Sequence, residues 1–239
     1  MKITYINHSC FLVELRTCLL LFDYYSEGLK GDGPVPGIDK LPDKKLYVFV
    51  SHKHPDHFDK RIFELEKIHA VTYYLISKDA KMNQNYIRKK GISESAWEKM
   101  RFVGKDENIE LDKGIAVMTL ASTDRGVAFL VKAEGNTIYH AGDLNWWSWE
   151  GETEECERDM ERRFKHEVKK LSEVVIDVAF LPLDPRQKDR FYWGFDYFMR
   201  QVKVKAAYPM HFWGDRTVIE RLREMEASEE YRDKIMEPI

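Results

Sequence analysis

The stretch His52-Lys53-His54-Pro55-Asp56-His57 follows directly after the apolar run Leu46-Tyr47-Val48-Phe49-Val50. Three of the eight histidines in this 239-residue chain fall within these six positions, and a carboxylate stands beside the third. Alternate side chains of an extended strand point to the same side, so the first two histidines can face one point in space. The aspartate and the last histidine add an oxygen and a nitrogen from the following turn. Such donors suit zinc, manganese or iron, and the pattern predicts a metal site rather than a solvated polar loop.

This hexad resembles the H-x-H-x-D-H signature of the metallo-β-lactamase fold hydrolases. Other landmarks of that superfamily follow in the expected order, each directly after a strand-like run. They are Asp23 after Leu19–Phe22, Asp143 after Thr137–Gly142, and His211 after Ala206–Met210. The resemblance therefore covers nearly the whole chain. It implies an α+β fold, the four-layer αββα sandwich, formed as a single domain by residues 1–239.

The resemblance also implies one or two divalent metal ions, with Zn²⁺ as the first expectation and Mn²⁺ or Fe²⁺ as alternatives. Their ligands would be His52 and His54 for the first ion, and Asp56, His57 and His211 for the second, with Asp143 bridging or close to both. Zinc is the default ion for a site rich in imidazole nitrogen.

Three residues receive further roles from the resemblance. Asp56 would be the catalytic residue, because in this superfamily it commonly steers the attacking water besides binding metal. Asp23 would accept hydrogen bonds that orient the ligands, and His140, three residues before the second aspartate, is placed in the same supporting layer.

One landmark of the superfamily is missing. A further histidine usually completes the first metal site from a loop between the hexad and the second aspartate. The corresponding loop, between predicted strands at residues 114–121 and 126–131, reads Ser122-Thr123-Asp124-Arg125. Three explanations stay open. Asp124 replaces the histidine as a ligand, which would favour manganese or iron; the first site keeps two histidines only; or Asp124 is a turn residue.

A metal-activated water needs no serine or cysteine nucleophile. We therefore expect a metal-dependent hydrolase acting on a small, anionic ester, lactone or phosphodiester. The run Asn7-His8-Ser9 and the residues before Asp143 look most like the branch that includes the ascorbate-6-phosphate lactonase. His8 and Ser9 themselves are interpreted as either pocket-lining or structural. The alternative function is a metal-binding sensor that has lost one metal site and its hydrolytic activity.

Three residues are candidates for substrate binding. Arg186 lies just past a predicted strand end, and its planar guanidinium suits recognition of a phosphate or carboxylate. Asn145 could donate a hydrogen bond to an oxyanion. Trp146 belongs to the run Leu144–Trp149, whose three tryptophans could wall a pocket for a small molecule or pack in the core.

Composition limits the remaining classes. The net charge of −3 and a pI near 6.3 give no basic footprint for nucleic acid. No run approaches the ~18 apolar residues of a membrane span. Three cysteines without paired spacing indicate reduced thiols and a cytoplasmic location. The expected partner is a small-molecule substrate, and the sequence is compatible with a homo-oligomer. The Gly/Pro-rich loop at residues 26–43 is long enough to be functional.

Overall fold

The computed structural model describes residues 1–27, 41 and 43–238. Contacts within the chain divide it into two compact units, residues 1–104 (unit 1) and residues 105–239 (unit 2), and each is described by itself. Most of the loop at residues 26–43, expected to be functional, lies outside the described residues.

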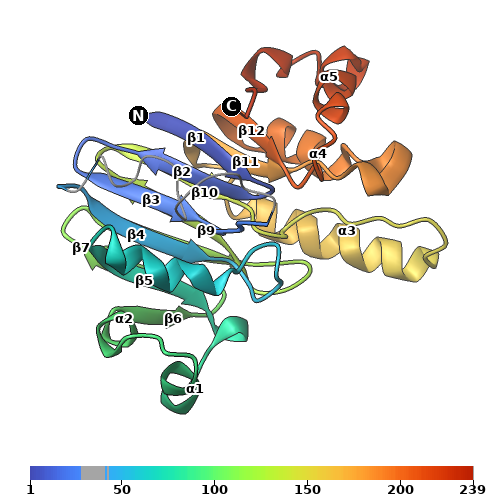
Figure 1. The fold of residues 1–239 in the computed structure, drawn as a ribbon. Helices are drawn as coiled ribbons and strands as arrows, with labels where there is room; N and C mark the ends of the chain where they lie inside the picture. The colour runs from blue at the N-terminus through green and yellow to red at the C-terminus, as the bar shows by residue number, and fades with distance from the viewer. Residues whose placement is uncertain (28–40, 42, 239) are drawn as a thin grey trace. The chain divides into compact units, whose positions relative to one another are not determined.

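Unit 1 carries a six-stranded mixed sheet whose strands lie in chain order (Figure 1). They are β1 (Lys2–Asn7), β2 (Cys10–Glu14), β3 (Cys18–Phe22), β4 (Lys45–Val50), β5 (Val71–Ser77) and β6 (Met100–Val103). Strands β1 to β3 are antiparallel, and β3 to β6 are parallel.

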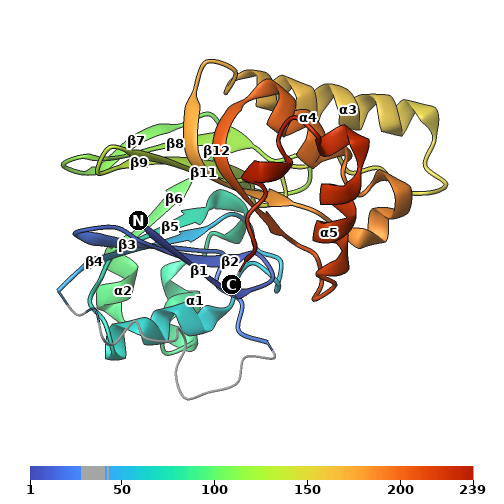
Figure 2. The same ribbon diagram turned by 90° about the horizontal axis from the view of Figure 1, so that it is seen from above.

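Short helices cover one face of this sheet, as Figure 2 shows. They are η2 (Lys60–Lys67), η3 (Lys78–Ala80), α1 (Gln84–Lys89) and α2 (Glu94–Glu98). Ile62 and Leu65 of η2 are fully buried and belong to the same apolar cluster as Leu46 and Val48 of β4. The helical face is thus held to the sheet by burial of aliphatic side chains.

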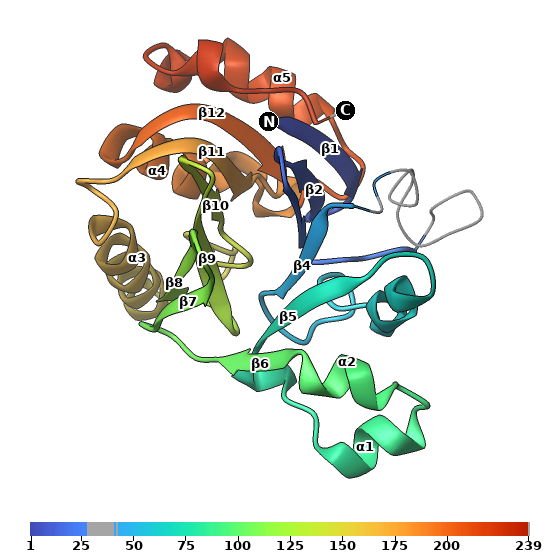
Figure 3. The ribbon, with the colours of Figure 1, turned by 90° about the vertical axis from the view of Figure 1, so that its left-hand side faces the viewer.

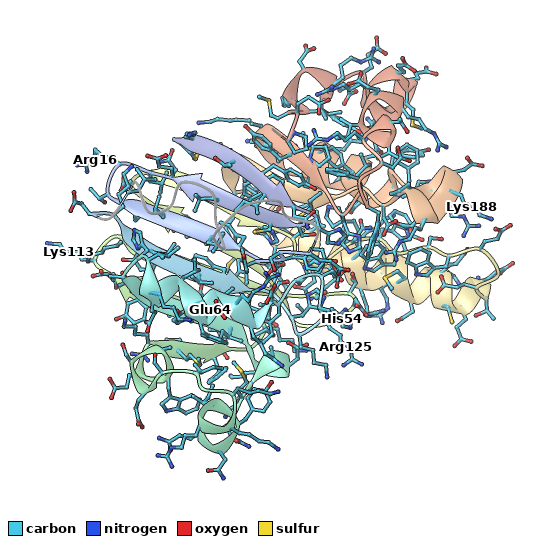
Figure 4. The ribbon with its side chains drawn as sticks, viewed as in Figure 1. Arg16, His54, Glu64, Lys113, Arg125 and Lys188 are labelled. Atoms are coloured by element: carbon cyan, nitrogen blue, oxygen red, sulfur yellow. The ribbon has the colours of Figure 1, made fainter. Side chains whose placement is uncertain are left out.

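The strand directions decide which residues share an edge of unit 1. Parallel β3 and β4 end together, with Phe22 paired to Phe49, so the residues after both strands meet at one edge. The turn between β1 and β2 reaches that edge too, because β2 runs antiparallel to β3. In Figure 4, His54 lies at this end of the sheet and Arg16, in the turn between β2 and β3, lies at the other.

Unit 2 carries the second six-stranded sheet, in the order β12-β11-β10-β9-β8-β7. The strands are β7 (Asn108–Asp112), β8 (Ile115–Ala121), β9 (Val127–Ala133), β10 (Asn136–His140), β11 (Val175–Pro182) and β12 (Lys203–Met210). Strands β7 to β10 are antiparallel, whereas β10, β11 and β12 are parallel. The carboxyl ends of these last three strands therefore share one edge.

The helices of unit 2 follow its parallel strands. They are α3 (Glu154–Lys169), η4 (Pro185–Arg190), α4 (Trp193–Gln201), α5 (Thr217–Glu224), η5 (Glu226–Ser228) and η6 (Arg232–Lys234). Helices α3 and α4 lie on the same side of the sheet (Figure 3), and Phe198 of α4 stacks on Tyr139 of β10 with ring centroids 4.9 Å apart. The Thr153 side chain caps α3 by accepting from the Cys156 N–H.

The predicted α+β fold, with two mixed sheets that carry helices, is confirmed. Strands β6 and β7 and helices α1, α2 and α4 carry no pattern strong enough to predict them, since most are only four to six residues long. In the described part of the chain, no helix is long and apolar enough to cross a membrane.

Candidate metal centre

The hexad of unit 1 brings its donor atoms together directly after β4. His52 Nε2 lies 3.0 Å from His54 Nδ1, and His57 Nε2 lies 3.9 Å from Asp56 Oδ2. The rings of His52 and His57 are also close, with centroids 4.2 Å apart. Two donors that each lie 2.0–2.1 Å from one tetrahedral zinc are about 3.3 Å apart. The donor separations in the hexad are thus of the size that a shared divalent ion requires.

Asp23 orients two of these histidines. Its carboxylate is fully buried, and Oδ2 accepts from His57 Nδ1 at 2.7 Å and from Ser51 Oγ at 2.5 Å. Because the Ser51 hydroxyl donates to the aspartate, its oxygen is left to accept from His52 Nδ1, 2.9 Å away. This network assigns the Nδ1–H tautomer to both imidazoles. His52 and His57 therefore present Nε2 lone pairs, as metal ligands must.

Unit 2 places Asp143 and His211 at its shared strand edge, after β10 and β12. His211 Nε2 lies 3.5 Å from Asp143 Oδ1, and both side chains are buried. His211 Nδ1 donates to Asp184 Oδ2 at 3.0 Å. Asp184, which follows β11, is fully buried and repeats in unit 2 the support that Asp23 gives in unit 1. Sequence reasoning did not assign it this role.

The charge of Asp184 is held by its neighbours. Burial by itself would raise the pKa of this carboxyl group, but hydrogen bonds from His211 and Arg186 outweigh burial and lower the pKa to about 2. Arg186 donates from Nη2 at 2.5 Å and from Nε at 3.0 Å. Asp184 is therefore an anion at any pH near neutrality, and His211 donates from Nδ1 to a permanent negative charge.

Three residues of these two edges have left-handed backbone conformations, which are uncommon for residues other than glycine. His8 has φ 49°, Asp23 has φ 42° and His211 has φ 64°. Left-handed conformations of other residues are uncommon and cluster at functional sites. The chain holds these side chains in place at a conformational cost, at the very positions that the donor sets occupy.

A model of the β-lactamase superfamily domain matches residues 2–155, which is more than half of the chain and includes the hexad and Asp143. The chain belongs to the metallo-β-lactamase superfamily. The resemblance inferred from the sequence is thereby confirmed at the level of the superfamily.

Individual relatives agree with this membership. A metal-dependent hydrolase of Opitutus terrae is 30% identical over 149 residues, which are 60% of this chain and 63% of that protein. The match thus spans less than two-thirds of that relative's length. A metal-dependent hydrolase of Alkaliphilus metalliredigens is 26% identical over 231 residues, covering 89% of this chain and 85% of the relative. The structure of Igni18, a metallo hydrolase of Ignicoccus hospitalis, superposes with a TM-score of 0.65 at 16% identity, covering 99% and 94% of the two chains.

The loop that lacks the usual histidine of the metallo-β-lactamase pattern is built around Thr123. The Thr123 hydroxyl is buried and donates to the Asn145 carbonyl at 2.6 Å, and it accepts from the Asn145 N–H at 3.0 Å. Asp124 is exposed, and its N–H donates to Ser122 Oγ at 3.1 Å, as in a turn. Its carboxylate nevertheless offers an oxygen within 4.8 Å of one from Asp143. Asp124 therefore serves the turn and lies near a predicted ligand.

His140 lies in the core at the end of β10 and is fully buried. Its Nδ1 accepts from the Gly142 N–H at 3.1 Å, and Gly142 has φ 52°. The histidine thus shapes the turn that precedes Asp143, and its supporting role at a metal site stays a prediction.

Arg186, expected to bind an anion, has its guanidinium paired with Asp184. The guanidinium also lies 4.4 Å from the ring centroid of Trp213 and 5.7 Å from that of Trp149. The neighbouring Lys188 and Arg190 form ion pairs with Glu150 and Glu157. All three cations of η4 are therefore engaged by carboxylates of the protein, although half of the Arg186 side chain is exposed.

The remaining substrate-binding candidates lie elsewhere in unit 2. The Asn145 amide is buried and donates to Gln187 Oε1 at 3.1 Å, so it holds two loops together. Trp146 lines a cavity of about 470 Å³ between α3 and α4, together with Trp193 and Tyr197. Trp147 instead packs on His211, with ring centroids 5.4 Å apart, and donates to the Asp143 carbonyl. The tryptophan run thus divides between a cavity wall and the support of the predicted ligands.

Proposed function

We propose that this chain is a metal-dependent hydrolase that uses a metal-activated water on a small ester, lactone or phosphodiester. Membership of the metallo-β-lactamase superfamily and relatives described as metal-dependent hydrolases support the proposal. The metal could be zinc, manganese or iron, because imidazole and carboxylate donors accept all three.

One observation carries the proposal. His52, His57 and His211 each have Nδ1 within hydrogen-bond distance of a group that accepts from it. In all three, Nε2 lies beside a second atom that could bind a metal: His54 Nδ1 at 3.0 Å, Asp56 Oδ2 at 3.9 Å and Asp143 Oδ1 at 3.5 Å, respectively. Buried histidines that serve packing alone do not need one tautomer imposed on each of them, whereas metal-binding histidines do.

The chemistry follows from the donor types. A divalent ion held by such donors lowers the pKa of a water ligand to about 7 and so supplies hydroxide near neutral pH. Asp56 is the residue to which we assign the general-base role: its carboxylate, 20% exposed while His57 beside it is fully buried, would orient the attacking water and take up its proton once an ion is bound. Asp23 and Asp184 keep the histidines in place throughout.

The superfamily pattern assigns metal ligands in unit 1 (His52, His54, Asp56 and His57) and in unit 2 (Asp143 and His211), and we carry that assignment forward as part of the proposal. The expectation of an anionic substrate, in contrast, has less support in the structure than in the sequence. Arg186, the intended anion ligand, donates to Asp184 through Nε and Nη2. We therefore propose that the substrate is an ester, lactone or phosphodiester, and we make no proposal about the charge of the substrate.

The test compares turnover and metal content in one preparation. The chain is stripped with a chelator, reloaded separately with Zn²⁺, Mn²⁺ or Fe²⁺, and assayed on lactone, ester and phosphodiester probes. We expect turnover that needs the ion and falls by a factor of about 10²–10⁴ in Asp56→Asn, the usual range for a general acid or base. The control is Asp177→Asn. Asp177 lies near the start of β11 and forms an ion pair with Lys205 of β12. Binding of the ion without turnover of any probe would contradict the hydrolase and favour a metal-dependent sensor.

A further inference from the structure

His8 is the one histidine at the metal-binding edge of unit 1 that the hexad does not contain. It lies in the turn between β1 and β2, and 5% of it is exposed. Its Nε2 lies 3.3 Å from Asp56 Oδ2. The sequence alone left His8 as either pocket-lining or structural.

The position of His8 follows from the strand pairing. β1 and β2 are antiparallel with a two-residue turn, and the register shifts between Tyr5 and Asn7, just before the turn. His8 takes φ 49° in this turn. Its ring meets that of His57 edge to face, with centroids 5.6 Å apart and planes at 86°. The turn conformation and the ring contact together fix where Nε2 points.

We propose that His8 is a metal ligand, and that it joins Asp56 and His57 in a two-histidine, one-carboxylate site formed by unit 1. The donor atoms of these three residues lie within 4.8 Å of one another. The 3.3 Å between His8 and Asp56 matches the separation of about 3.3 Å expected for two donors on one tetrahedral zinc. The inference rests on the proposed function in one respect, that Asp56 and His57 bind an ion.

Three donors from one unit have a chemical consequence. A two-histidine, one-carboxylate set leaves coordination positions open for water and substrate, and it suits iron, manganese and zinc alike. Unit 1 then retains an ion even when His211 of unit 2 is removed. The competing explanation is a plain ion pair between a His8 imidazolium and Asp56, which would stabilise the metal-free protein and leave metal affinity unchanged.

His8→Asn in the full-length chain separates these two explanations. Asparagine tolerates a positive φ but lacks the imidazole donor, so the turn is kept while the ligand is lost. The affinity for Zn²⁺ and Mn²⁺ is measured by competition with a chromogenic chelator, and the bound ions are counted by elemental analysis. The Co²⁺-loaded protein gives a visible spectrum that reports the donor set. His166→Asn, on the exposed face of α3, controls for the loss of a histidine.

We expect His8→Asn to lower the affinity for one ion at least 10-fold and to change the Co²⁺ spectrum, with the melting temperature of the metal-free protein unchanged. His8→Gly, which accepts φ 49° without strain, should behave in the same way. Affinity within twofold of the wild type in both variants would overturn the inference. Because these measurements need no turnover, an inactive wild type that binds metal through His8 would refute the proposed function and leave this inference standing.

Discussion

The two units support their histidines by the same device but assemble their donors differently. In each, a buried aspartate after a parallel strand accepts from a histidine Nδ1, at 2.7 Å from His57 to Asp23 and at 3.0 Å from His211 to Asp184. Unit 1 takes most of its donors from one hexad. Unit 2 takes Asp143, Asp184 and His211 from the ends of three different strands. Both carboxylate–histidine pairs thus join residues from the ends of two parallel strands, and the units differ in whether the potential metal ligands are contiguous in the sequence.

The largest expected effect comes from removing a ligand. His57→Asn should lower metal affinity by more than 100-fold, because the residue is fully buried and adjoins Asp56 and His52. His211→Asn should have a smaller effect if His8 helps unit 1 to hold its ion. Chelator competition on both variants measures the difference, and equal losses would show that the two units contribute equally.

The next largest loss of metal affinity should come from replacing either of the two supporting aspartates, Asp23 or Asp184. Loss of such a support typically lowers metal affinity 10- to 100-fold. Asp23→Asn should lower metal affinity by about 100-fold, because Asp23 holds His57 directly and His52 through Ser51. Asp184→Asn should lower metal affinity by about 10-fold, because among the predicted ligands Asp184 is hydrogen-bonded to His211. A larger loss of affinity for the same ion in Asp184→Asn than in Asp23→Asn would contradict the view that the loss grows with the number of histidines that the aspartate supports.

A smaller effect concerns stability within unit 2. A methyl group at Gly194 would collide with Asn145 Oδ1 and crowd the Trp146 backbone nitrogen, so Gly194→Ala must displace the loop that follows Asp143. We expect a loss of about 1–3 kcal/mol in the free energy of unfolding, the usual cost of overpacking, read from denaturant titration. In an Asn145→Ala background the cost should fall only in part, because the Trp146 backbone nitrogen, 2.9 Å from the added methyl group, is still in the way. An undiminished cost in that background would show that Asn145 is not the obstacle.

The smallest effect should come from Asp124→Asn. This side chain is exposed and its backbone serves a turn, although its carboxylate lies within 4.8 Å of that of Asp143. We expect metal affinity to fall by less than in either Asp23→Asn or Asp184→Asn, as measured by the same competition assay. A larger fall would make Asp124 a full replacement for the absent histidine.

The sequence predicted the hexad because its donors are contiguous and follow an apolar strand. It predicted Asp143 and His211 because each follows a strand in the order of a known superfamily. The sequence did not predict that Asp184 supports His211, because this contact depends on the parallel pairing of β11 with β12, in which Pro182 is opposite Met210. The pairing of β2 with β3 likewise places His8 at the edge where the hexad lies. A search for histidines and aspartates at every strand end and tight turn would have found both.

Arg186 shows the opposite limit of sequence reasoning. A cation after a strand end is a reasonable anion ligand, but its partner depends on which carboxylate lies nearest in the folded chain. That partner is Asp184, two residues earlier, with the guanidinium within 6 Å of the ring centroids of Trp149 and Trp213. Side-chain pairing of this kind is decided by packing, which no spacing rule describes.

The central claim is that His52, His57 and His211 present Nε2 to divalent ions. Elemental analysis of the full-length chain after gel filtration tests it most directly, with the wild type compared to a His57→Asn/His211→Asn double variant. The account predicts at least one tightly held divalent ion per wild-type chain and a loss of most of that metal in the double variant. A wild type without bound metal, or a double variant that retains the full complement, would contradict it.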